Sequence, residues 1–318
     1  MGIKNLNRFL LDNCSKKSIK KTHLKQFANK TLVIDTSIYL YKFMGDNTLL
    51  ESMYLFISIL KHYNIVAIFV FDGKPPPEKK QLLIQRRIEK NDAEQKYLEL
   101  QKKLDDETVK DKDQAFIEME HLRKQFIRIK EEDINKVKQL MEYYGVTYYD
   151  AHGEADLLCI HLVKTGVAWG CISDDMDMFL YGCPRVIRHI SLLNHTVVFY
   201  DLNLILNDLK MSHKIFCEIM VLSGTDYNIQ SQTNLYDTMK WYYKYLAQKE
   251  PFDFYDWLMQ YSNYIKEYEG LKKTFNMFST ADYDIPNLST VHESITIDMP
   301  RLQTLMETDG FVFVQPCH

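Results

Sequence analysis

Acidic residues follow short apolar runs at several places in this sequence. Asp35 follows TLVI, Asp72 follows VAIFVF, Asp150 follows VTYY, the group Asp174, Asp175 and Asp177 follows WGCIS, and HGEAD supplies Glu154 and Asp156. In an open parallel sheet, ligands bind outside the carboxyl ends of the strands. We therefore expect several of these carboxylates to meet at one edge of a sheet.

Such a gathering of carboxylates predicts a metal site. Two like charges 4 Å apart repel by about 4 kcal/mol at an effective dielectric constant of 20, so a cluster without counter-ions is unstable. Carboxylates together with water are the ligands that Mg²⁺ prefers. The pattern predicts an enzyme that uses two metal ions to act on phosphate esters.

Composition and charge limit the other possibilities. The chain has 318 residues, 46% of them hydrophobic, and a net charge of −4, so any polyanion must bind to local basic patches. One such patch is the segment 15–30, which has six lysines and no acid. Six cysteines without a CxxC pair, no leader peptide and no long apolar run favour an intracellular protein.

The elements that would position the acids alternate between strands and helices. Residues 31–35 and 65–71 are expected to be buried strands, and residues 49–62 a buried helix. This alternation predicts an α/β fold with a parallel sheet. After GKPPP, one long helix is expected from residue 78 to about 104 and a second to about 144, so that residues 78–130 form a polar helical excursion.

The second half of the chain continues the pattern and then changes in composition. Strands are expected at VTYY and VAWGCIS and in two short runs, RVIRHI and TVVFYD, with a helix over 212–223. Residues 236–268 are crowded with Tyr, Trp and Phe. We expect a domain boundary near residue 228, with a core at 1–228 and a small helical region at 229–318.

Five segments in this order resemble the flap endonuclease family of structure-specific 5′ nucleases over roughly residues 1–228. They are VIDTSIYLYKF, VFDGKPPPEKKQLLIQRR, DAHGEADLLCIHLVKTG, ISDDMDMFLYGCPRVIRHI and LSGTDY, and they follow MGIKNL, which is similar to the family's start. The resemblance implies an XPG-type, PIN-like α/β nuclease core with an inserted helical arch at about 78–130. The implied substrate is DNA with 5′ flaps or junctions of single strand and duplex, cut during replication or repair.

The resemblance also assigns roles to individual residues. The implied ligands of two Mg²⁺ ions, for which Mn²⁺ would substitute, are Asp35, Asp72, Glu154, Asp156, Asp175, Asp177 and Asp226. The implied catalytic pair is Lys79 and Arg86, which also contact nucleic acid, as do Gly2 at the N-terminus and Tyr41 as a base-stacking ring. At Asp156 family members commonly have Glu, so the shorter side chain puts the metal geometry in question. The implied location is the nucleus or, for a member encoded by a large DNA virus, a cytoplasmic replication site.

The chain departs from the family after Asp226-Tyr227. Family members have a Gly-rich helix–two-turn–helix hairpin there, but this chain reads NIQSQTNLYDTMKWYY, with no Gly-x-Gly. Polar residues from Gln230 to Asn234, followed by Lys240, would have to contact the duplex instead. No sliding-clamp motif is evident. Looser binding of duplex is the expected consequence.

Plainer explanations exist for several of these residues. A lone Asp after a strand is usually a turn or capping residue, and we assign Asp150 and Asp174 to that class. Tyr41 alone would be a core residue, and the lysines of 16–25 a solvated face. A dehalogenase-type phosphatase needs an Asp where this chain has Ser37. The alternatives that stay open are a 5′→3′ exoribonuclease of the same superfamily and a non-catalytic binder of branched DNA.

Overall fold

The structure of the chain is a computed structural model, and it describes residues 3–106, 111–228, 233–248, 251–279, 291–292 and 296–313. Eight strands of the described residues form one mixed sheet with the order β1-β7-β6-β5-β2-β3-β4-β8. The strands are β1 (Ile19–His23), β2 (Thr31–Asp35), β3 (Val66–Phe71), β4 (Thr147–Asp150), β5 (Gly170–Ile172), β6 (Arg185–Ser191), β7 (Thr196–Asp201) and β8 (Val291–His292).

The five central strands β6, β5, β2, β3 and β4 are parallel, as the alternation of elements predicts. The edges of the sheet are antiparallel, because β7 pairs with β6, β1 with β7 and β8 with β4. The α/β fold class is therefore confirmed, but the sheet is mixed. β1 was not predicted, because its residues alternate too weakly between apolar and polar side chains to indicate a strand.

Helices cover both faces of the sheet. Along β2, Val33 packs into one core cluster and its neighbours Leu32 and Ile34 into the other, because successive side chains point to opposite faces. These three side chains are fully buried, which explains why the run TLVI contains no polar residue. The covering helices are α1 (Leu6–Asn13), α7 (Ala155–Lys164), α8 (Asp177–Leu180), α9 (Leu202–Leu209) and α10 (His213–Leu222) on one face, and α2 (Thr36–Gly45), α3 (Leu49–His62) and α6 (Glu131–Tyr143) on the other.

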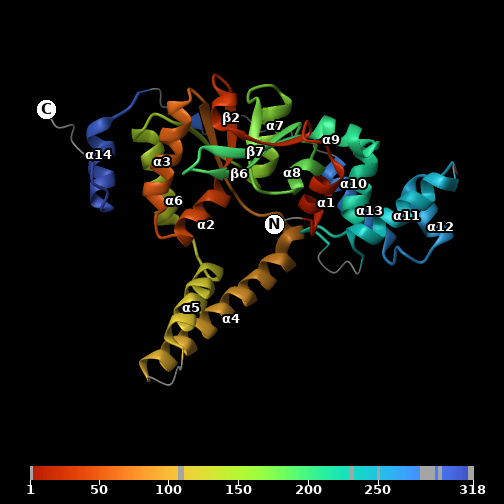
Figure 1. The fold of residues 1–318 in the computed structure, drawn as a ribbon, viewed down its shortest axis with the longest axis horizontal. Coiled ribbons are helices and arrows are strands. Elements are labelled where there is room, and N and C mark those ends of the chain that lie inside the picture. The colour runs from red at the N-terminus through yellow and green to blue at the C-terminus, as the bar shows by residue number, and fades with distance from the viewer. Residues whose placement is uncertain are drawn as a thin grey trace.

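A helical hairpin stands out from the body of the molecule (Figure 1). It consists of α4 (Lys80–Asp105), which follows a 3₁₀ turn at Pro77–Lys79, and α5 (Lys112–Gln125). The two helices pack against each other, with Ala93 and Leu122 among their buried side chains, and Arg128, which follows α5, forms an ion pair with Glu94 of α4 at 2.7 Å. The polar composition of this segment follows from its projection into solvent.

The second predicted helix, from about 114 to 144, is wrong as a single element. The helix α5 ends at Gln125, and a separate helix, α6, begins at Glu131. The carboxylate of Asp133 accepts a hydrogen bond from the backbone N–H of Lys130 at 2.9 Å, which caps a new helix. The break turns the chain from the projecting hairpin back to the sheet.

The helices after residue 228 occupy two places. They are α11 (Leu235–Gln248), α12 (Phe254–Tyr261), α13 (Tyr268–Ser279) and α14 (Met299–Thr308). The first three pack beside α10 through aromatic side chains such as Phe254 and Trp257. In contrast, α14 lies at the opposite end of the molecule and packs on α6 through Leu302 and Met306 (Figure 1). None of the described helices has the length and apolar character needed to cross a membrane.

Candidate active site

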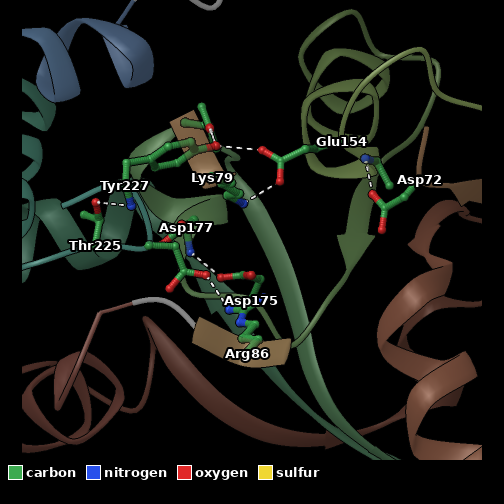
Figure 2. Close-up of polar contacts among 11 residues, drawn as sticks. Asp72, Lys79, Arg86, Glu154, Asp175, Asp177, Thr225 and Tyr227 are labelled. Carbon is green, nitrogen blue, oxygen red and sulfur yellow. Dashed lines mark hydrogen bonds and ion pairs between the residues drawn. The ribbon is translucent and has the colours of Figure 1, made fainter. Parts of the chain in front are cut away.

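The parallel strands deliver the predicted acids to one edge of the sheet. Asp35 is the last residue of β2, Asp72 follows β3, and Asp175 and Asp177 follow β5. After β4, Glu154 is the N-cap of α7 and Asp156 lies in its first turn, so the two side chains are not separated along a helix. Asp226 comes from the loop after α10. Figure 2 shows Asp72, Glu154, Asp175 and Asp177 around a common region.

Asp72 is held in place by a close backbone contact. Gly73 donates from its backbone N–H to the carbonyl of Gly153 at 2.7 Å, and a Cβ atom at Gly73 would lie only 2.0 Å from the carbonyl oxygen of Ala151. Only glycine fits there. The approach allows Oδ1 of Asp72 to accept the backbone N–H of Ala155 at 2.7 Å, at the positive N-terminus of α7 (Figure 2).

A short relay of hydrogen bonds fixes the segment after β5. The hydroxyl of Ser173 donates to Oδ2 of Asp35 at 2.9 Å and accepts the N–H of Asp175 at 3.1 Å. Oδ1 of Asp175 then accepts the N–H of Asp177 at 2.9 Å. Ser173 was not among the predicted site residues, although its position between a buried strand and three acids indicates a place in the site.

The acids raise one another's pKa values. Burial, with repulsion from Asp72 and Asp175, raises the pKa of Asp35 to about 8, although the Ser173 hydroxyl opposes the rise. Burial also raises the pKa of Asp156 well above its usual range, with repulsion from Asp35, Asp175 and Asp72. The structure has therefore gathered carboxylates whose charges the protein alone does not balance.

Asp177 has a buried carboxylate without a hydrogen-bond partner among the described residues. Its residue is 1% exposed, and neither oxygen of its carboxylate has a hydrogen-bond partner among the described residues. Burial raises its pKa well above the ordinary value, and repulsion from Asp175 and Asp226 adds to the effect. An unpaired buried carboxylate is strongly unfavourable and is typical of a group that binds a cation.

Two basic side chains from the base of the hairpin reach into the acids. Nζ of Lys79 lies 2.5 Å from Oε1 of Glu154, and Nη2 of Arg86 lies 2.8 Å from Oδ2 of Asp226. Burial lowers the pKa of Lys79, but attraction to Glu154 and to further acids outweighs burial and raises it. The two residues thus pair with different acids, one on α7 and one after α10.

The donor set fits a divalent cation by its chemistry, because it consists of carboxylate oxygens that include the unpartnered pair of Asp177. Within the part of the chain that the structure describes, no three or more His, Cys, Asp or Glu side chains are arranged so that they could hold an ion as they stand. Lys79 and Arg86 occupy Glu154 and Asp226 instead. An ion bound by Glu154 or Asp226 would have to share that carboxylate with Lys79 or Arg86, or replace the basic side chain there.

The remaining predicted residues differ in their contacts and exposure. The Tyr41 side chain is 45% exposed, and Nζ of Lys90 lies 4.8 Å from its ring centroid, on the hairpin side. Lys240 is ion-paired with Asp237 of its own helix at 2.8 Å and is largely exposed. Gly2 lies outside the described residues, as do Gln230, Ser231 and Gln232.

Tyr227 is a second residue that the sequence analysis passed over. Its hydroxyl donates to Oε2 of Glu154 at 2.7 Å, and its ring lies against Lys79 (Figure 2). A cavity of about 620 Å³ adjoins Tyr227 and Asp226 and extends between the start of α4 and α13. Of the seven acids, Asp226 lines this cavity.

Comparison with known families gives two matches. The family described as XPG N-terminal domain matches residues 1–93, and the one described as XPG I-region matches residues 145–226. Together they cover more than half of the chain and include all seven acids. The segment between them contains most of the projecting hairpin.

Individual proteins are similar over longer stretches. Flap endonuclease 1 from Methanococcus aeolicus is 29% identical over 312 residues, which are 93% of this chain and 87% of the relative. With other curated flap endonuclease 1 relatives the match spans only 52% to 62% of the relative's length. Among solved structures, flap endonuclease-1 from Methanococcus jannaschii has a TM-score of 0.62 at 23% identity, over 93% of this chain and 92% of that one. The catalytic core of Rad2 in complex with DNA substrate has a TM-score of 0.61 at 20% identity, over 98% and 95%.

Proposed function

The chain belongs to the XPG-type flap endonuclease family, and from this premise we propose that it is a metal-dependent, structure-specific 5′ nuclease. Its substrates would be flap, branched or 5′-ended DNA, cut by hydrolysis of a phosphodiester bond. The observation that carries the proposal is the gathering of seven carboxylates at one sheet edge, with Asp177 buried and unpartnered. A protein that only binds DNA gains nothing from such a cluster, which repels phosphate.

The carboxylates would hold two Mg²⁺ ions, with Mn²⁺ as a substitute. The proposed ligands are Asp35, Asp72, Glu154, Asp156, Asp175, Asp177 and Asp226. When bound, the ions would neutralise charge on the phosphoryl group and lower the pKa of the attacking water. Asp72 and Asp35 are already oriented for this role by the N–H of Ala155 and the hydroxyl of Ser173.

Lys79 and Arg86 would stabilise the negative charge that develops on the phosphoryl oxygens. Both stand at the base of the hairpin and both already face the acids. A phosphate that enters the site competes with Glu154 and Asp226 for these two cations. Arg86 offers several N–H donors in a plane, so it can contact a phosphoryl oxygen while it still touches a carboxylate.

The hairpin of α4 and α5 is proposed as a gateway for the single-stranded 5′ end. Its base carries Lys79 and Arg86, and Tyr41 stands exposed beside Lys90. Stacking of a base on Tyr41 would contribute about 1–3 kcal/mol without sequence preference. The face of Tyr41 that Lys90 covers must be cleared first, or the base must use the opposite face.

The division of the chain into a nuclease core at 1–228 and a helical region at 229–318 remains part of this proposal. The helices α11 to α13 would support contacts to duplex DNA, with Lys240 among the residues that meet phosphates. The exposure of Lys240 is compatible with this role, and its partner Asp237 can be exchanged for a phosphate. The structure of Rad2 that resembles this chain was solved in complex with DNA substrate.

Cleavage of a labelled panel tests the proposal. The substrates are a single strand, a nicked duplex, a 5′ flap, splayed arms and a four-way junction, each as DNA and as matching RNA, with Mg²⁺, with Mn²⁺ and with EDTA. We expect metal-dependent cleavage of 5′-ended or flapped DNA that is lost in Asp72→Ala. Preference for RNA would identify an exoribonuclease. Tight binding of branched DNA without cleavage in either metal would identify a non-catalytic binder.

A further inference from the structure

Tyr227 touches an acid and a base of the site at the same time. Its hydroxyl donates to Oε2 of Glu154 at 2.7 Å, while Nζ of Lys79 contacts the other oxygen, Oε1, at 2.5 Å. The same ammonium lies 4.9 Å from the centroid of the Tyr227 ring. The three side chains therefore form a closed triangle in which each contacts the other two (Figure 2).

Tyr227 is itself held in place by Tyr181 and Phe278. The hydroxyl oxygens of Tyr181 and Tyr227 are 2.8 Å apart. Because Tyr227 gives its only hydroxyl proton to Glu154, Tyr181 must be the donor in this pair. Tyr181 is 3% exposed, and Phe278 of α13 packs against the rings of both tyrosines. The Tyr227 hydroxyl is thus fixed in position before any ligand arrives.

We infer that Tyr227 is a positioning residue that orients Glu154 as a metal ligand and keeps Lys79 beside it. The inference deepens the proposed function and rests on it. A carboxylate that binds a metal with one oxygen is commonly steered by a hydrogen bond to the other, and loss of such a partner typically weakens metal affinity or activity by 10–100-fold. Tyr227 supplies this hydrogen bond to Glu154.

The ring of Tyr227 has a separate effect on Lys79. When Oε1 of Glu154 turns toward a cation, Lys79 loses its hydrogen-bond partner. The attraction between the ammonium and the ring uses no hydrogen bond, so it persists. Lys79 is then kept in place with its N–H donors free for a phosphoryl oxygen. The ring of Tyr227 would therefore keep Lys79 in the site after Oε1 of Glu154 has turned to a metal ion.

Two substitutions separate the hydroxyl from the ring. Tyr227→Phe removes the hydrogen bond to Glu154 and the one from Tyr181 but keeps the ring, whereas Tyr227→Leu removes the hydroxyl and the ring. Tyr255→Phe is the matched control, because the Tyr255 hydroxyl also donates a hydrogen bond of 2.7 Å, but to the backbone carbonyl of Glu218 on α10. Binding of Mn²⁺ is measured by calorimetry without DNA, and single-turnover cleavage is measured at saturating DNA.

We expect Tyr227→Phe to weaken Mn²⁺ binding roughly 10-fold and to slow single-turnover cleavage by a similar factor, with DNA affinity unchanged. Tyr227→Leu should slow cleavage further, and this extra loss should disappear when Lys79→Ala is already present, because the ring acts through Lys79. Tyr255→Phe should match the wild type in both measurements.

The outcomes that overturn the inference differ from those that overturn the proposed function. A wild-type protein that binds no Mn²⁺ and cuts no DNA refutes the proposed function. If the wild type is active and Tyr227→Phe equals it in metal affinity and rate, Tyr227 has no positioning role. Equal losses in Tyr227→Phe and Tyr255→Phe would mean that any buried hydroxyl has this effect, which also overturns the inference.

Discussion

Replacement of Asp177 by Asn should stabilise the metal-free protein and weaken its response to metal. Asp177 is 1% exposed, and neither of its carboxylate oxygens has a partner in the described ranges. Asp175, Asp226 and Glu154 all repel it, and Lys79 offsets only part of that repulsion. Asn has nearly the same shape and carries no charge. Its amide NH₂ group can donate hydrogen bonds to these acids.

The size of the effect follows from these contacts. One neighbouring charge at 4 Å contributes about 4 kcal/mol of repulsion at an effective dielectric constant of 20, before attraction to Lys79 is subtracted. A net gain of about 2 kcal/mol in the metal-free protein is therefore expected, or roughly 3 °C in melting temperature for a chain of this size. In the wild type, metal at 100 times its dissociation constant should add about 2.7 kcal/mol. A tenfold loss of affinity in Asp177→Asn would remove about half of that stabilisation.

Thermal melts in EDTA and in a titration of Mg²⁺, without DNA, measure both effects. Asp174→Asn is the matched control, because Asp174 lies on the same loop but accepts the backbone N–H of His189 at 2.7 Å, which the Asn carbonyl can also accept. This control should keep the wild-type shift with metal. The reasoning is refuted if Asp177→Asn melts below the wild type in EDTA, or if its shift with Mg²⁺ equals that of the wild type.

Two further predictions concern Glu218 and Arg86. Burial raises the pKa of Glu218 to about 7, against the attraction of Lys214 and with repulsion from Asp253 and Asp256. Because the folded state binds this proton more tightly than the unfolded state, its effect is most favourable below about pH 4.5 and is lost as the pH rises toward 7. Glu218→Gln should therefore raise the free energy of unfolding at pH 8 by up to about 3 kcal/mol relative to the wild type, and its melting temperature with it, but should equal the wild type at pH 4.5. Equal melting temperatures of the two proteins at both pH values would contradict this. Arg86→Ala should slow single-turnover cleavage about 100-fold with little change in DNA affinity. Replacement of the exposed neighbour in Arg87→Ala should leave the cleavage rate and the DNA affinity unchanged. A weaker affinity with an unchanged rate at saturation would make Arg86 a tether for phosphate only.

The fold was predictable wherever burial imposes a simple pattern. The helix at Leu49–His62 and the strand at Val66–Phe71 lie within a residue of the predicted ranges, because one face of the helix and most of the strand are buried and rich in apolar residues. The position of Glu154 at the entrance of α7 was also predictable, since the two acids of HGEAD converge only there. Residues with such strong local constraints need little tertiary information.

The rest depended on contacts between segments far apart in the chain. β1 forms only because β7 offers it an antiparallel edge, and the break before α6 reflects the return of the hairpin to the sheet. The spacing of seven residues between Lys79 and Arg86 would put both on one face of a continuous helix, but Lys79 lies in the 3₁₀ turn before α4, and the two pair with different acids. Tyr227 gave no signal because a single tyrosine in sequence does not show what its hydroxyl meets.

The two ion pairs at the base of the hairpin connect charge balance to substrate entry. Seven carboxylates face two cations there, so a phosphate group is repelled unless more positive charge arrives. Divalent ions bound by the acids would reduce this repulsion and would compete with Lys79 for Glu154 and with Arg86 for Asp226. The base of α4 would then be released from Glu154 and Asp226 when its cations gain a phosphate to bind, while Arg123 and Lys124 still hold α5 to residues 45–47. Under the proposed function, metal binding should therefore precede productive entry of the DNA strand, since it removes the repulsion and the two tethers together.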